Sequence, residues 1–258
     1  MTKSPHIQVT TADRITTIRF DRPDKKNALT FEMYASMASA VEAAAGDDAV
    51  RAVVIAGSRD CFTAGNDLGD FMRTAQGAAG SDPAAAFSFL RAIATFEKPL
   101  IGAVAGVAIG IGTTMLLHCD LVYAAPSARF KVPFVDLGLV PEAGSSVLLP
   151  ALVGPRRAAQ LLLLGEQLDA PTALDWGLIN GVTDDPDAAA QAAARRLAAA
   201  APYALRITKS LTRRTSRDAV LEAMRIEGEA FAERLRSPEA MEAFQAFGAR
   251  RPPDYSRF

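Results

Sequence analysis

This sequence of 258 residues is poor in the side chains that build metal centres and disulfide frameworks. It has only two cysteines, Cys61 and Cys119, and two histidines, His6 and His118. The cysteines form neither a CxxC pair nor another metal-ligand spacing, and two histidines exclude a His-rich metal site. Two cysteines this far apart in a chain of this size also indicate a reducing compartment. We therefore expect no metal site.

Neither sign of charge is in excess. The chain has 28 Lys and Arg against 29 Asp and Glu, a formal net charge of −1. No overall field would therefore attract nucleic acid or an anionic membrane. Half of the residues are hydrophobic and 22% are charged, which is typical of a globular protein with one large domain or a domain with an appended lobe.

A recognisable targeting or membrane segment is also missing. The first residues, MTKSPHIQVTTADRI, show no apolar signal core and no Arg- and Ser-rich amphipathic pattern. The longest apolar run, residues 100–117, is interrupted by glycines and by Thr113 and Thr114, so strand, turn and helix explain it better than a membrane span. The final SRF is not an SKL-type peroxisomal address. The expected location is the cytoplasm, with neither nucleic acid nor a membrane as partner.

Strand and helix patterns alternate over the first two-thirds of the sequence. Residues 7–20, IQVTTADRITTIRF, predict a β-hairpin, and Thr30 can cap a helix that Gly46 ends. The nearly continuous apolar run at 50–58 is typical of a strand buried on both faces. The other expected elements are strands at 98–109, 121–125 and 128–133, helices at 84–97 and after Gly110, a mobile loop at 75–83, and mostly helices from Gly154 onward. This order predicts an α/β fold with a helical C-terminal third.

A glycine-bearing turn, GIGTT at 110–114, follows one of these strands. It lacks the third glycine of a dinucleotide-binding fingerprint, since Met115 stands in that place, and the sequence has no Walker A pattern. A strand that ends at Ile109 and a helix that starts after two glycines leave backbone N–H groups without an intrahelical partner. Such groups can stabilise developing negative charge on an oxygen. A plain tight turn is the alternative explanation.

The stretch AGNDL at 64–68 repeats this arrangement, with small residues and a loop that presents the N–H of Asn66. Two such turns after neighbouring buried strands could place two donors around one carbonyl oxygen. That arrangement is an oxyanion hole, and it suits enolate chemistry on a thioester.

Several motifs together resemble the crotonase (enoyl-CoA hydratase/isomerase) superfamily. CFTAGNDL is similar to its first signature and AVAGVAIGIGTTMLLHCDLVYAAPSARFKVP to its second, and the match continues through PALVG, GEQLDAPTALDWGLINGV and PYALRITKSL. The resemblance implies a spiral of ββα units over residues 1–200 and a helical oligomerisation region over 201–258, in a homotrimer or a dimer of trimers. It assigns the oxyanion donors to the N–H groups of Asn66 and Ile111. It implies no separate cofactor, because coenzyme A is part of the thioester substrate.

The resemblance also indicates where an acyl-CoA thioester would bind. DRPDKKNAL is similar to the loop around the adenine end of coenzyme A, with Lys25 near the phosphates and Ala28 facing the adenine. AFGARR is similar to a segment whose Phe247 and Arg250 reach coenzyme A in a neighbouring subunit. A solvated loop and an ordinary amphipathic helix end are the alternatives for these two segments. The residues expected at the substrate are Lys25, Ala28, Ala64, Asp67, Leu68, Gly110, Phe134, Leu139, Phe247 and Arg250, of which Asp67 chiefly organises its loop.

Two acids that hydratases of this family use are absent. One glutamate normally follows the glycine turn and the other ends the next strand, and here Thr114 and Phe134 occupy those positions. Hydration requires a base for water and a proton for the α carbon. A threonine hydroxyl is no base near neutral pH, and Phe134 has no proton to exchange. The sequence therefore disfavours efficient hydration.

One acid remains in the segment PFVDLGLVPEAGSS, which resembles the Δ3,Δ2-enoyl-CoA isomerase branch of the superfamily. In that branch a single glutamate, here Glu142, takes a proton from C2 and returns it to C4. Apolar neighbours would raise the pKa of Glu142 toward neutrality and exclude water. The neighbours expected to do so are Phe134, Leu137, Leu139 and Val140. The alternative is a solvated loop acid in a turn made by Pro141 and Gly144.

Other polar residues are weaker candidates. Asp136 is an alternative base, although the alternation of a strand is expected to turn it away from Phe134. His118 and Cys119 are expected in the core at a helix end. We predict an acyl-CoA isomerase that moves a β,γ double bond to the α,β position, with an acyl pocket wall in residues 69–90. A hydratase or related lyase and a non-catalytic acyl-CoA-binding protein are the alternatives.

Overall fold

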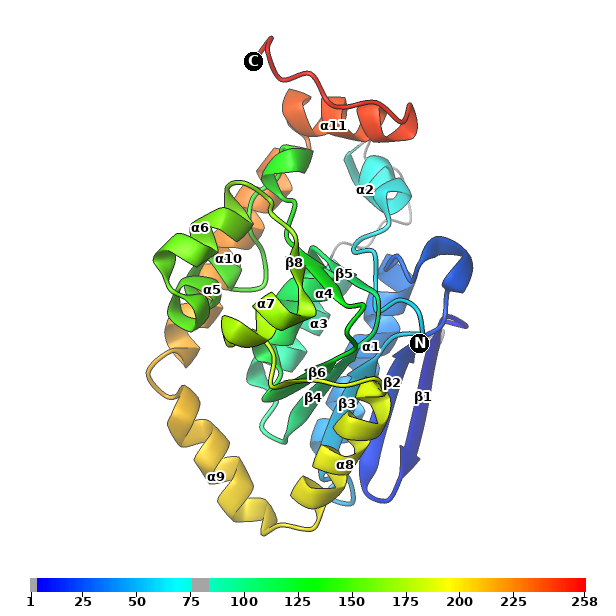
Figure 1. The fold of residues 1–258 in the computed structure, drawn as a ribbon, viewed down its shortest axis with the longest axis vertical. Helices are drawn as coiled ribbons and strands as arrows, with labels where there is room; N and C mark the ends of the chain where they lie inside the picture. Colours follow the sequence, from blue (N-terminus) through cyan, green and yellow to red (C-terminus); the bar gives the residue numbers. More distant parts are fainter. Residues whose placement is uncertain (1–3, 76–83) are drawn as a thin grey trace.

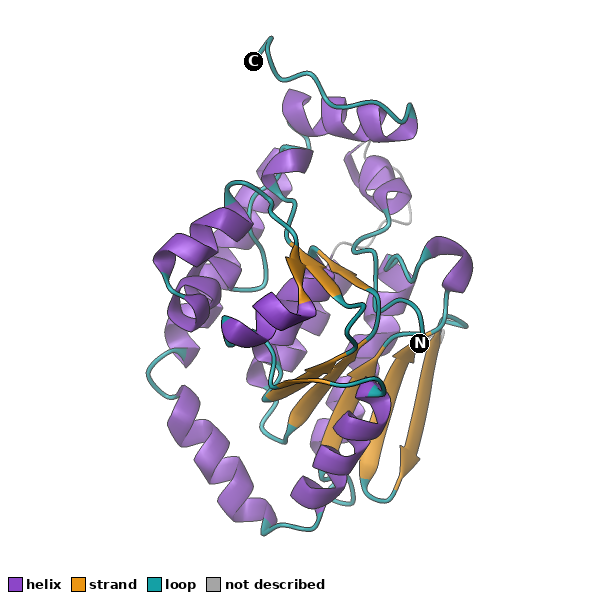
Figure 2. Ribbon diagram, in the orientation of Figure 1, coloured by secondary structure: helices purple, strands orange, loops and turns teal. Residues whose placement is uncertain are grey.

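The computed structural model describes residues 4–75 and 84–258, so nearly all of the loop expected at 75–83 lies outside the described residues. The strands form two sheets (Figures 1 and 2), a large one in the order β1-β2-β3-β4-β6-β9 and a small one in the order β5-β7-β8. The large sheet contains β1 (Ile7–Ala12), β2 (Ile15–Phe20), β3 (Ala52–Ala56), β4 (Leu100–Val104), β6 (Leu121–Ala124) and β9 (Gly181–Val182). The small sheet contains β5 (Val107–Ile109), β7 (Arg129–Lys131) and β8 (Leu168–Asp169).

Helices cover both faces of the large sheet. They are α1 (Phe31–Gly46), α2 (Leu68–Ala75), α3 (Ala84–Thr95), α4 (Ile111–Thr114), α5 (Ser145–Val153), α6 (Pro155–Leu162), α7 (Ala170–Asp175), α8 (Pro186–Ala198), α9 (Pro202–Arg213), α10 (Arg217–Arg234) and α11 (Pro238–Gly248). Short 3-10 turns are η1 (Pro23–Lys25), η2 (Met115–His118) and η3 (Val135–Leu137). In β3, Val53 and Ile55 belong to the cluster that contains α1 and α3, whereas Val54 packs with α8. Successive side chains of a strand point to opposite faces, which explains why all of β3 is apolar.

Consecutive strands are divided between the two sheets. β4 pairs in the large sheet and β5 in the small one, and β6 and β7 repeat this division. The chain turns between β4 and β5 at Gly106, where φ is +61° and an added Cβ would lie 2.0 Å from the carbonyl oxygen of Asp60. Only glycine fits such an approach. The single strand expected at 98–109 is therefore two strands, and pairs of this kind followed by helices form the expected ββα spiral.

Several local expectations are confirmed. The hairpin β1–β2 is antiparallel, and the Thr30 hydroxyl accepts the N–H of Met33 at the start of α1. One expectation is wrong, because residues 135–137 form the 3-10 turn η3 and not a strand. The strands β8 and β9, two residues each, lie in a region where the sequence indicates mostly helices.

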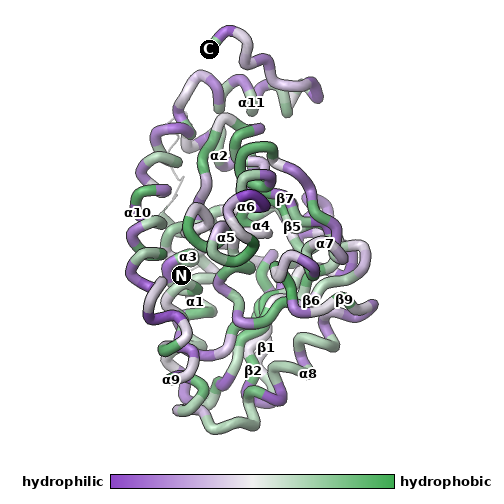
Figure 3. Tube along the Cα trace, turned by 60° about the vertical axis from the view of Figure 1, so that its left-hand side comes forward, coloured by the Kyte–Doolittle hydropathy of each residue, from purple (hydrophilic) through white to green (hydrophobic). Residues whose placement is uncertain are grey.

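The C-terminal helices differ in how they pack. Helix α9 has no buried residue, and α10 buries one stripe made of Val220, Ala223, Glu227 and Gly228. In Figure 3 the hydrophobic colour follows the central strands, while α10 alternates between hydrophilic and hydrophobic residues. Figure 1 shows α11 beside α2, at the opposite end of the molecule from α9. In the described part of the chain, no helix is both long and apolar enough to cross a membrane.

Candidate active site

The glycine turn at the start of α4 has a backbone that only glycine adopts readily. Gly110 precedes the helix with φ 55° and ψ −119°, and its carbonyl accepts the N–H groups of Thr113 and Thr114. Ile111, the first residue of α4, is fully buried. Its N–H lies in the first turn of the helix, where amides have no intrahelical acceptor.

The second glycine turn lies directly beside the first. The N–H of Thr63 donates to Val107 O at 2.9 Å, and the N–H of Ile109 donates to Thr63 O at 3.0 Å. A Cβ at Gly65 would lie 2.9 Å from Ile109 O, so only glycine allows the two backbones to come this close. Within residues 4–75 and 84–258, the N–H groups of Asn66 and Ile111 donate to no other residue. Each of the two neighbouring turns thus leaves one backbone amide without an acceptor among the described residues.

Tyr34 of α1 holds the side chain of Asn66. Its hydroxyl donates to Asn66 Oδ1 at 2.5 Å, and only 1% of the tyrosine is exposed. Burial raises the pKa of Tyr34 well above its usual value, and the charge of Glu142 raises it further. The phenol is therefore a neutral donor at physiological pH, close to both Asn66 and Glu142.

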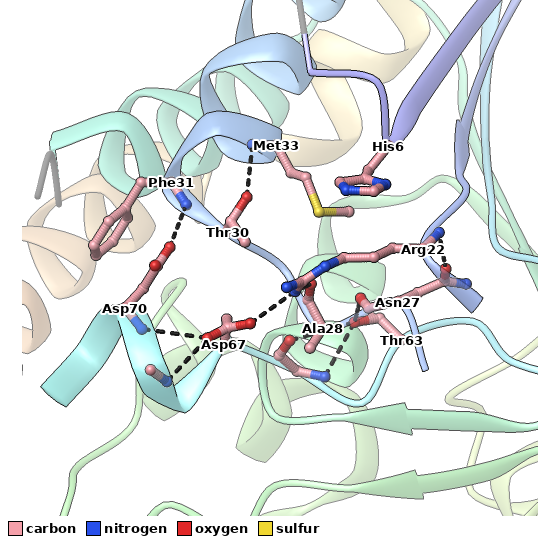
Figure 4. A network of polar contacts seen from close by, with 12 residues as sticks. His6, Arg22, Asn27, Ala28, Thr30, Phe31, Met33, Thr63, Asp67 and Asp70 are labelled. Carbon is pink, nitrogen blue, oxygen red and sulfur yellow. Dashed lines mark hydrogen bonds and ion pairs between the residues drawn. The ribbon is translucent and has the colours of Figure 1, made fainter. Parts of the chain in front are cut away.

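A polar network connects the Lys25–Ala28 loop to the Asn66 turn (Figure 4). The Arg22 guanidinium donates to Asp67 Oδ2 at 2.7 Å and to Ala28 O at 2.8 Å. Asp67 also accepts the N–H of Gly69 at 2.9 Å at the start of α2. Burial tends to raise the pKa of Asp67, but the hydrogen bond and charge of Arg22 and the backbone donors outweigh it, so that pKa is lowered. Asp67 therefore organises this loop, as its position in the sequence suggests.

Glu142 lies in the loop between η3 and α5, and its side chain is partly buried. Its Oε1 accepts a hydrogen bond from the Thr114 hydroxyl at 3.1 Å. Loss of solvation raises the pKa of Glu142 from 4.5 to about 7, against the hydrogen bond from Thr114, which lowers it, while the charge of Glu227 raises it. This shift has the direction that the sequence predicts. A carboxyl group with this pKa can both accept and donate a proton near neutral pH.

The backbone after Glu142 is held from two sides. Ala143 has a positive φ of 60°, which is unusual for a residue other than glycine, and Gly144 has φ 71°. His118 Nε2 lies 2.8 Å from Ala143 O. Burial lowers the pKa of His118 to about 4, so the ring is neutral and donates its Nε2 proton to this carbonyl. On the other side, Glu227 of α10 accepts the N–H of Gly144 at 2.6 Å.

Glu142 and Asn66 face the same apolar cavity, which has a volume of about 130 Å³. Its wall comes from the start of α1 and from α2, α3 and α10. The other described residues that line it are Phe31, Phe71, Thr74, Ala86, Phe87, Leu90, Ala143, Met224, Gly228, Phe231, Ala232, Leu235 and Arg236. Among these described residues Glu142 is the only acid. The wall expected in residues 69–90 is thus present, and α10 supplies the facing side.

Two of the apolar residues expected around Glu142 lie in the main core. Phe134 and Leu139 are 3% and 4% exposed and belong to the main core, and they are not among the described residues that line the cavity. Asp136 forms an exposed ion pair with Lys131 at 3.0 Å. It lies on the 3-10 turn η3 and not on a strand, so the expected strand alternation does not apply to it. Asp136 is not among the described residues that line the cavity with Glu142, and it stays the weaker alternative base.

The residues expected to bind coenzyme A lie in two places. Lys25 and Ala28 belong to a loop whose Lys26 carbonyl accepts the N–H of Ala64 at 2.9 Å, so this loop borders the Asn66 turn. Leu68 begins α2, directly after Asp67.

Phe247 and Arg250 are exposed near the end of α11, and neither is among the described residues that line the cavity. Their contact with coenzyme A in a neighbouring subunit stays a prediction.

Sequence reasoning missed the residues that position the site. Tyr34 and Glu227 sit in amphipathic helices and give no local signal, because each acts on a loop far away in the chain. Arg22 could have been noticed, since it stands in the DRPDKKNAL segment next to the lysines. In the described residues no group of three or more His, Cys, Asp and Glu is arranged to hold a metal ion.

Comparison with known proteins identifies relatives along nearly the whole chain. Residues 10–257 match the profile of a family described as enoyl-CoA hydratase/isomerase. Enoyl-CoA delta isomerase 2 of Rattus norvegicus is 35% identical over 255 residues, covering 97% of this chain and 65% of the rat protein. The 1,2-epoxyphenylacetyl-CoA isomerase of Escherichia coli (strain K12) is 35% identical over 248 residues, covering 94% of this chain and 95% of that protein.

The fold has close counterparts among solved structures. An enoyl-CoA hydratase/isomerase from Pseudoalteromonas atlantica T6c superposes with a TM-score of 0.91 at 42% identity, covering 97% of this chain and 99% of that chain. This chain thus matches 99% of the length of the Pseudoalteromonas atlantica protein chain. It matches 65% of the length of the rat protein, which is somewhat less than two thirds.

Proposed function

Because this chain belongs to the enoyl-CoA hydratase/isomerase family and has the crotonase fold, we propose that it is an enoyl-CoA isomerase with Glu142 as its only acid–base group. The reaction moves a β,γ double bond of an enoyl-CoA to the α,β position. The observation that carries the proposal is a single carboxyl group with a pKa of about 7 in the apolar cavity that Asn66 also lines.

The proposed reaction has two proton transfers. The ionised Glu142 removes a proton from C2 of the 3-enoyl thioester, and the electron pair moves toward the thioester oxygen to give a dienolate. The N–H groups of Asn66 and Ile111 stabilise the charge on that oxygen. The protonated Glu142 then delivers its proton to C4, the electrons return, and the 2-enoyl thioester and the ionised glutamate result.

The surroundings of Glu142 support isomerisation over hydration. Hydration needs a second group that activates the water or protonates the α carbon of the substrate. The described cavity wall contains no acid other than Glu142. Thr114 stands where a hydratase has a glutamate, and here its hydroxyl is used as a donor to Glu142. The apolar wall also keeps water from the dienolate and suits a hydrocarbon acyl chain.

We further propose that Lys25 and Ala28 contact coenzyme A, because their loop is hydrogen-bonded to the Asn66 turn. Self-association in trimers is supported by the apolar side chains that α9 exposes, which are Tyr203, Ile207 and Leu211. A polar residue at these positions would lower the mass measured by light scattering if α9 forms the interface.

The test is incubation of the purified protein with 3-enoyl- and 2-enoyl-CoA of several chain lengths. Ultraviolet absorbance of the conjugated thioester reports isomerisation, and mass spectrometry reports added water. We expect isomerisation with little hydration, and a loss of about 10²–10⁴-fold in kcat for Glu142→Gln. Asp136→Asn is the matched control, because it removes the other acid of the same segment without touching the cavity.

Each other outcome selects an alternative. Isomerisation that survives Glu142→Gln would contradict the assigned role of this residue. Rapid hydration of 2-enoyl-CoA would favour a hydratase, and tight binding of both thioesters without turnover would favour a non-catalytic acyl-CoA-binding protein.

A further inference from the structure

Glu227 is a buried acid far from Glu142 in sequence. Only 7% of it is exposed, and it lies on the buried stripe of α10. Its Oε2 accepts the N–H of Gly144 at 2.6 Å and its Oε1 accepts the N–H of Ser146 at 2.9 Å. In the described part of the chain it forms no ion pair with a lysine or arginine. A buried carboxylate without a cation is costly unless hydrogen bonds compensate, so these two amides are what holds it there.

The segment that Glu227 contacts is the turn directly after Glu142. Ala143 and Gly144 both have positive φ, and α5 begins at Ser145 without a capping side chain of its own. Glu227 therefore replaces the missing N-cap of α5 from another helix. Helix α10 also packs tightly on this turn, because an added Cβ at Gly144 would lie 3.0 Å from Val220.

The turn is thus held from three elements at consecutive residues. Thr114 of α4 binds the Glu142 carboxyl group, His118 of η2 binds Ala143 O, and Glu227 of α10 binds the amide of Gly144. Without Glu227, the contacts from α4 and η2 remain, but the amides of Gly144 and Ser146 have no acceptor from α10.

The charged and titratable groups around Glu142 come from α1, η2, α10 and the segment just after α10. Tyr34 of α1 and the buried His118 of η2 are neutral near pH 7. Arg236, just after α10, lines the same cavity. Glu227 is the one whose charge acts on Glu142, and it acts to keep that group protonated.

From this geometry we infer that Glu227 is a positioning residue for the acid–base group, so that α10 belongs to the catalytic machinery and not only to the helical C-terminal region. Its contacts hold the turn that aims Glu142 at the cavity, and its negative charge favours the protonated form of that carboxyl group. The inference rests on the proposed role of Glu142 in proton transfer.

Two substitutions separate the two effects. Glu227→Gln keeps the size of the side chain but removes its charge and one acceptor oxygen. Glu227→Asp keeps the charge but shortens the reach to the two amides. Glu233→Gln is the matched control, because it removes the same charge from an exposed position of the same helix.

The main measurement is the pKa of Glu142, followed by infrared difference spectra of the protonated carboxyl band across pH. The band of Glu142 is the one that disappears in Glu142→Gln. We expect Glu227→Gln to lower this pKa, Glu227→Asp to leave it raised, and Glu233→Gln to leave it unchanged. Glu227→Gln and Glu227→Asp should both reduce kcat/KM for 3-enoyl-CoA by about 10- to 100-fold, because small misplacements of a reacting group are expensive.

The inference would be overturned if Glu227→Gln left both the pKa of Glu142 and kcat/KM as in the unmodified protein. It would also be overturned if Glu233→Gln shifted that pKa equally, since a general charge effect would then suffice. The spectroscopic titration needs no turnover. A protein that shifts this pKa as expected but isomerises no thioester would retain the positioning role and lose the proposed function.

Discussion

Asp67 and Glu142 are two acids on neighbouring loops of one site, and their surroundings shift them in opposite directions. Asp67 is paired with Arg22 and accepts backbone N–H groups, so its pKa is lowered. Glu142 loses solvent, and among the described residues only the Thr114 hydroxyl donates to it, so its pKa rises to about 7. The chemical type of the side chain is nearly the same in both.

The difference teaches that the partners of a carboxyl group, and not its presence, decide its task. A cation and two amides keep Asp67 ionised near neutral pH, and in this state it holds the loop around Ala28 and Asn66 together. An apolar cavity makes Glu142 a group that can change its protonation state during a reaction. Each test below either removes a partner of one of the two carboxyl groups or gives Glu142 a charged partner like that of Asp67.

The largest expected effect is on stability and concerns Glu142→Gln. The folded-state pKa of Glu142 is about 7 and its ordinary value is 4.5, so the unfolded chain releases this proton more easily. Wild-type stability should therefore fall as pH rises from about 4.5 to about 7, by roughly 3 kcal/mol in total. The Glu142→Gln variant has no carboxyl group at this position and should not lose this stability as pH rises. Chemical denaturation should therefore show that the variant is more stable than wild type at pH 8 but not at pH 4. Equal differences at both pH values would contradict the raised pKa.

The next effect concerns Arg22→Gln, which leaves Asp67 without its cation. Both side chains are largely buried, so the loss should cost about 1–3 kcal/mol at pH 7. The lowered pKa of Asp67 means that this stability is present above its ordinary value of 3.8 and disappears as pH falls further. Thermal melting at pH 7 and pH 3 should show the difference shrinking. Arg225→Gln breaks two exposed ion pairs on α10 and should change the melting temperature little at either pH.

A smaller effect is expected when Glu142 receives the kind of partner that Asp67 has. Met224 lines the cavity on α10, and Met224→Lys places a cation in its wall. The pKa of Glu142 should fall, and kcat/KM at pH 7 should drop about tenfold because a more acidic carboxylate is a weaker base. Met224→Gln, which is polar and uncharged, controls for the lost apolar contact. A pH profile of kcat/KM that did not move toward acid in Met224→Lys would argue against Glu142 as the titrating group.

The smallest effect is expected for Thr114→Val, which removes the only hydrogen bond that the described residues donate to the Glu142 carboxyl group. That bond lowers the pKa of Glu142, so the pH profile should move slightly upward. A single hydrogen bond to a charged group is worth about 1.5–3 kcal/mol at most, and part of it is recovered by solvent, so we expect a decrease of a few-fold in kcat/KM. Thr114→Ser keeps the hydroxyl and should restore the wild-type profile; a valine variant with unchanged kinetics would show that the bond is incidental.

Much of the fold could be predicted because it is encoded locally. The hairpin β1–β2, the apolar strand β3 and the cap at Thr30 follow from patterns a few residues long. The two glycine turns were predictable for the same reason, since a positive φ or a close backbone approach requires glycine at the position itself. The 3-10 turn η3 was not, because its apolar residues look the same as a short strand.

Of the side chains that form and position the candidate site, only some were predictable. Glu142 stands out as a lone acid in an apolar segment, whereas Tyr34, His118 and Glu227 have no feature that marks them. They act on Asn66, Ala143 and Gly144, which lie 32, 25 and 83 residues away in the chain. Pairings at such separations depend on how α1, η2 and α10 pack, and no local pattern carries that information.

Two adjoining loops with small residues, and one carboxyl group available for proton transfer, follow from the amino-acid order by itself, because backbone conformation and side-chain chemistry are properties of single positions. The protonation state of that carboxyl group does not follow from the amino-acid order by itself. Burial against α2, α3 and α10, a hydroxyl from α4 and a buried charge from α10 set it, and only folding brings these groups within a few ångströms of one another. Desolvation and electrostatic interaction depend on distance in space, so the tertiary structure decides which acid stays charged and which can exchange its proton.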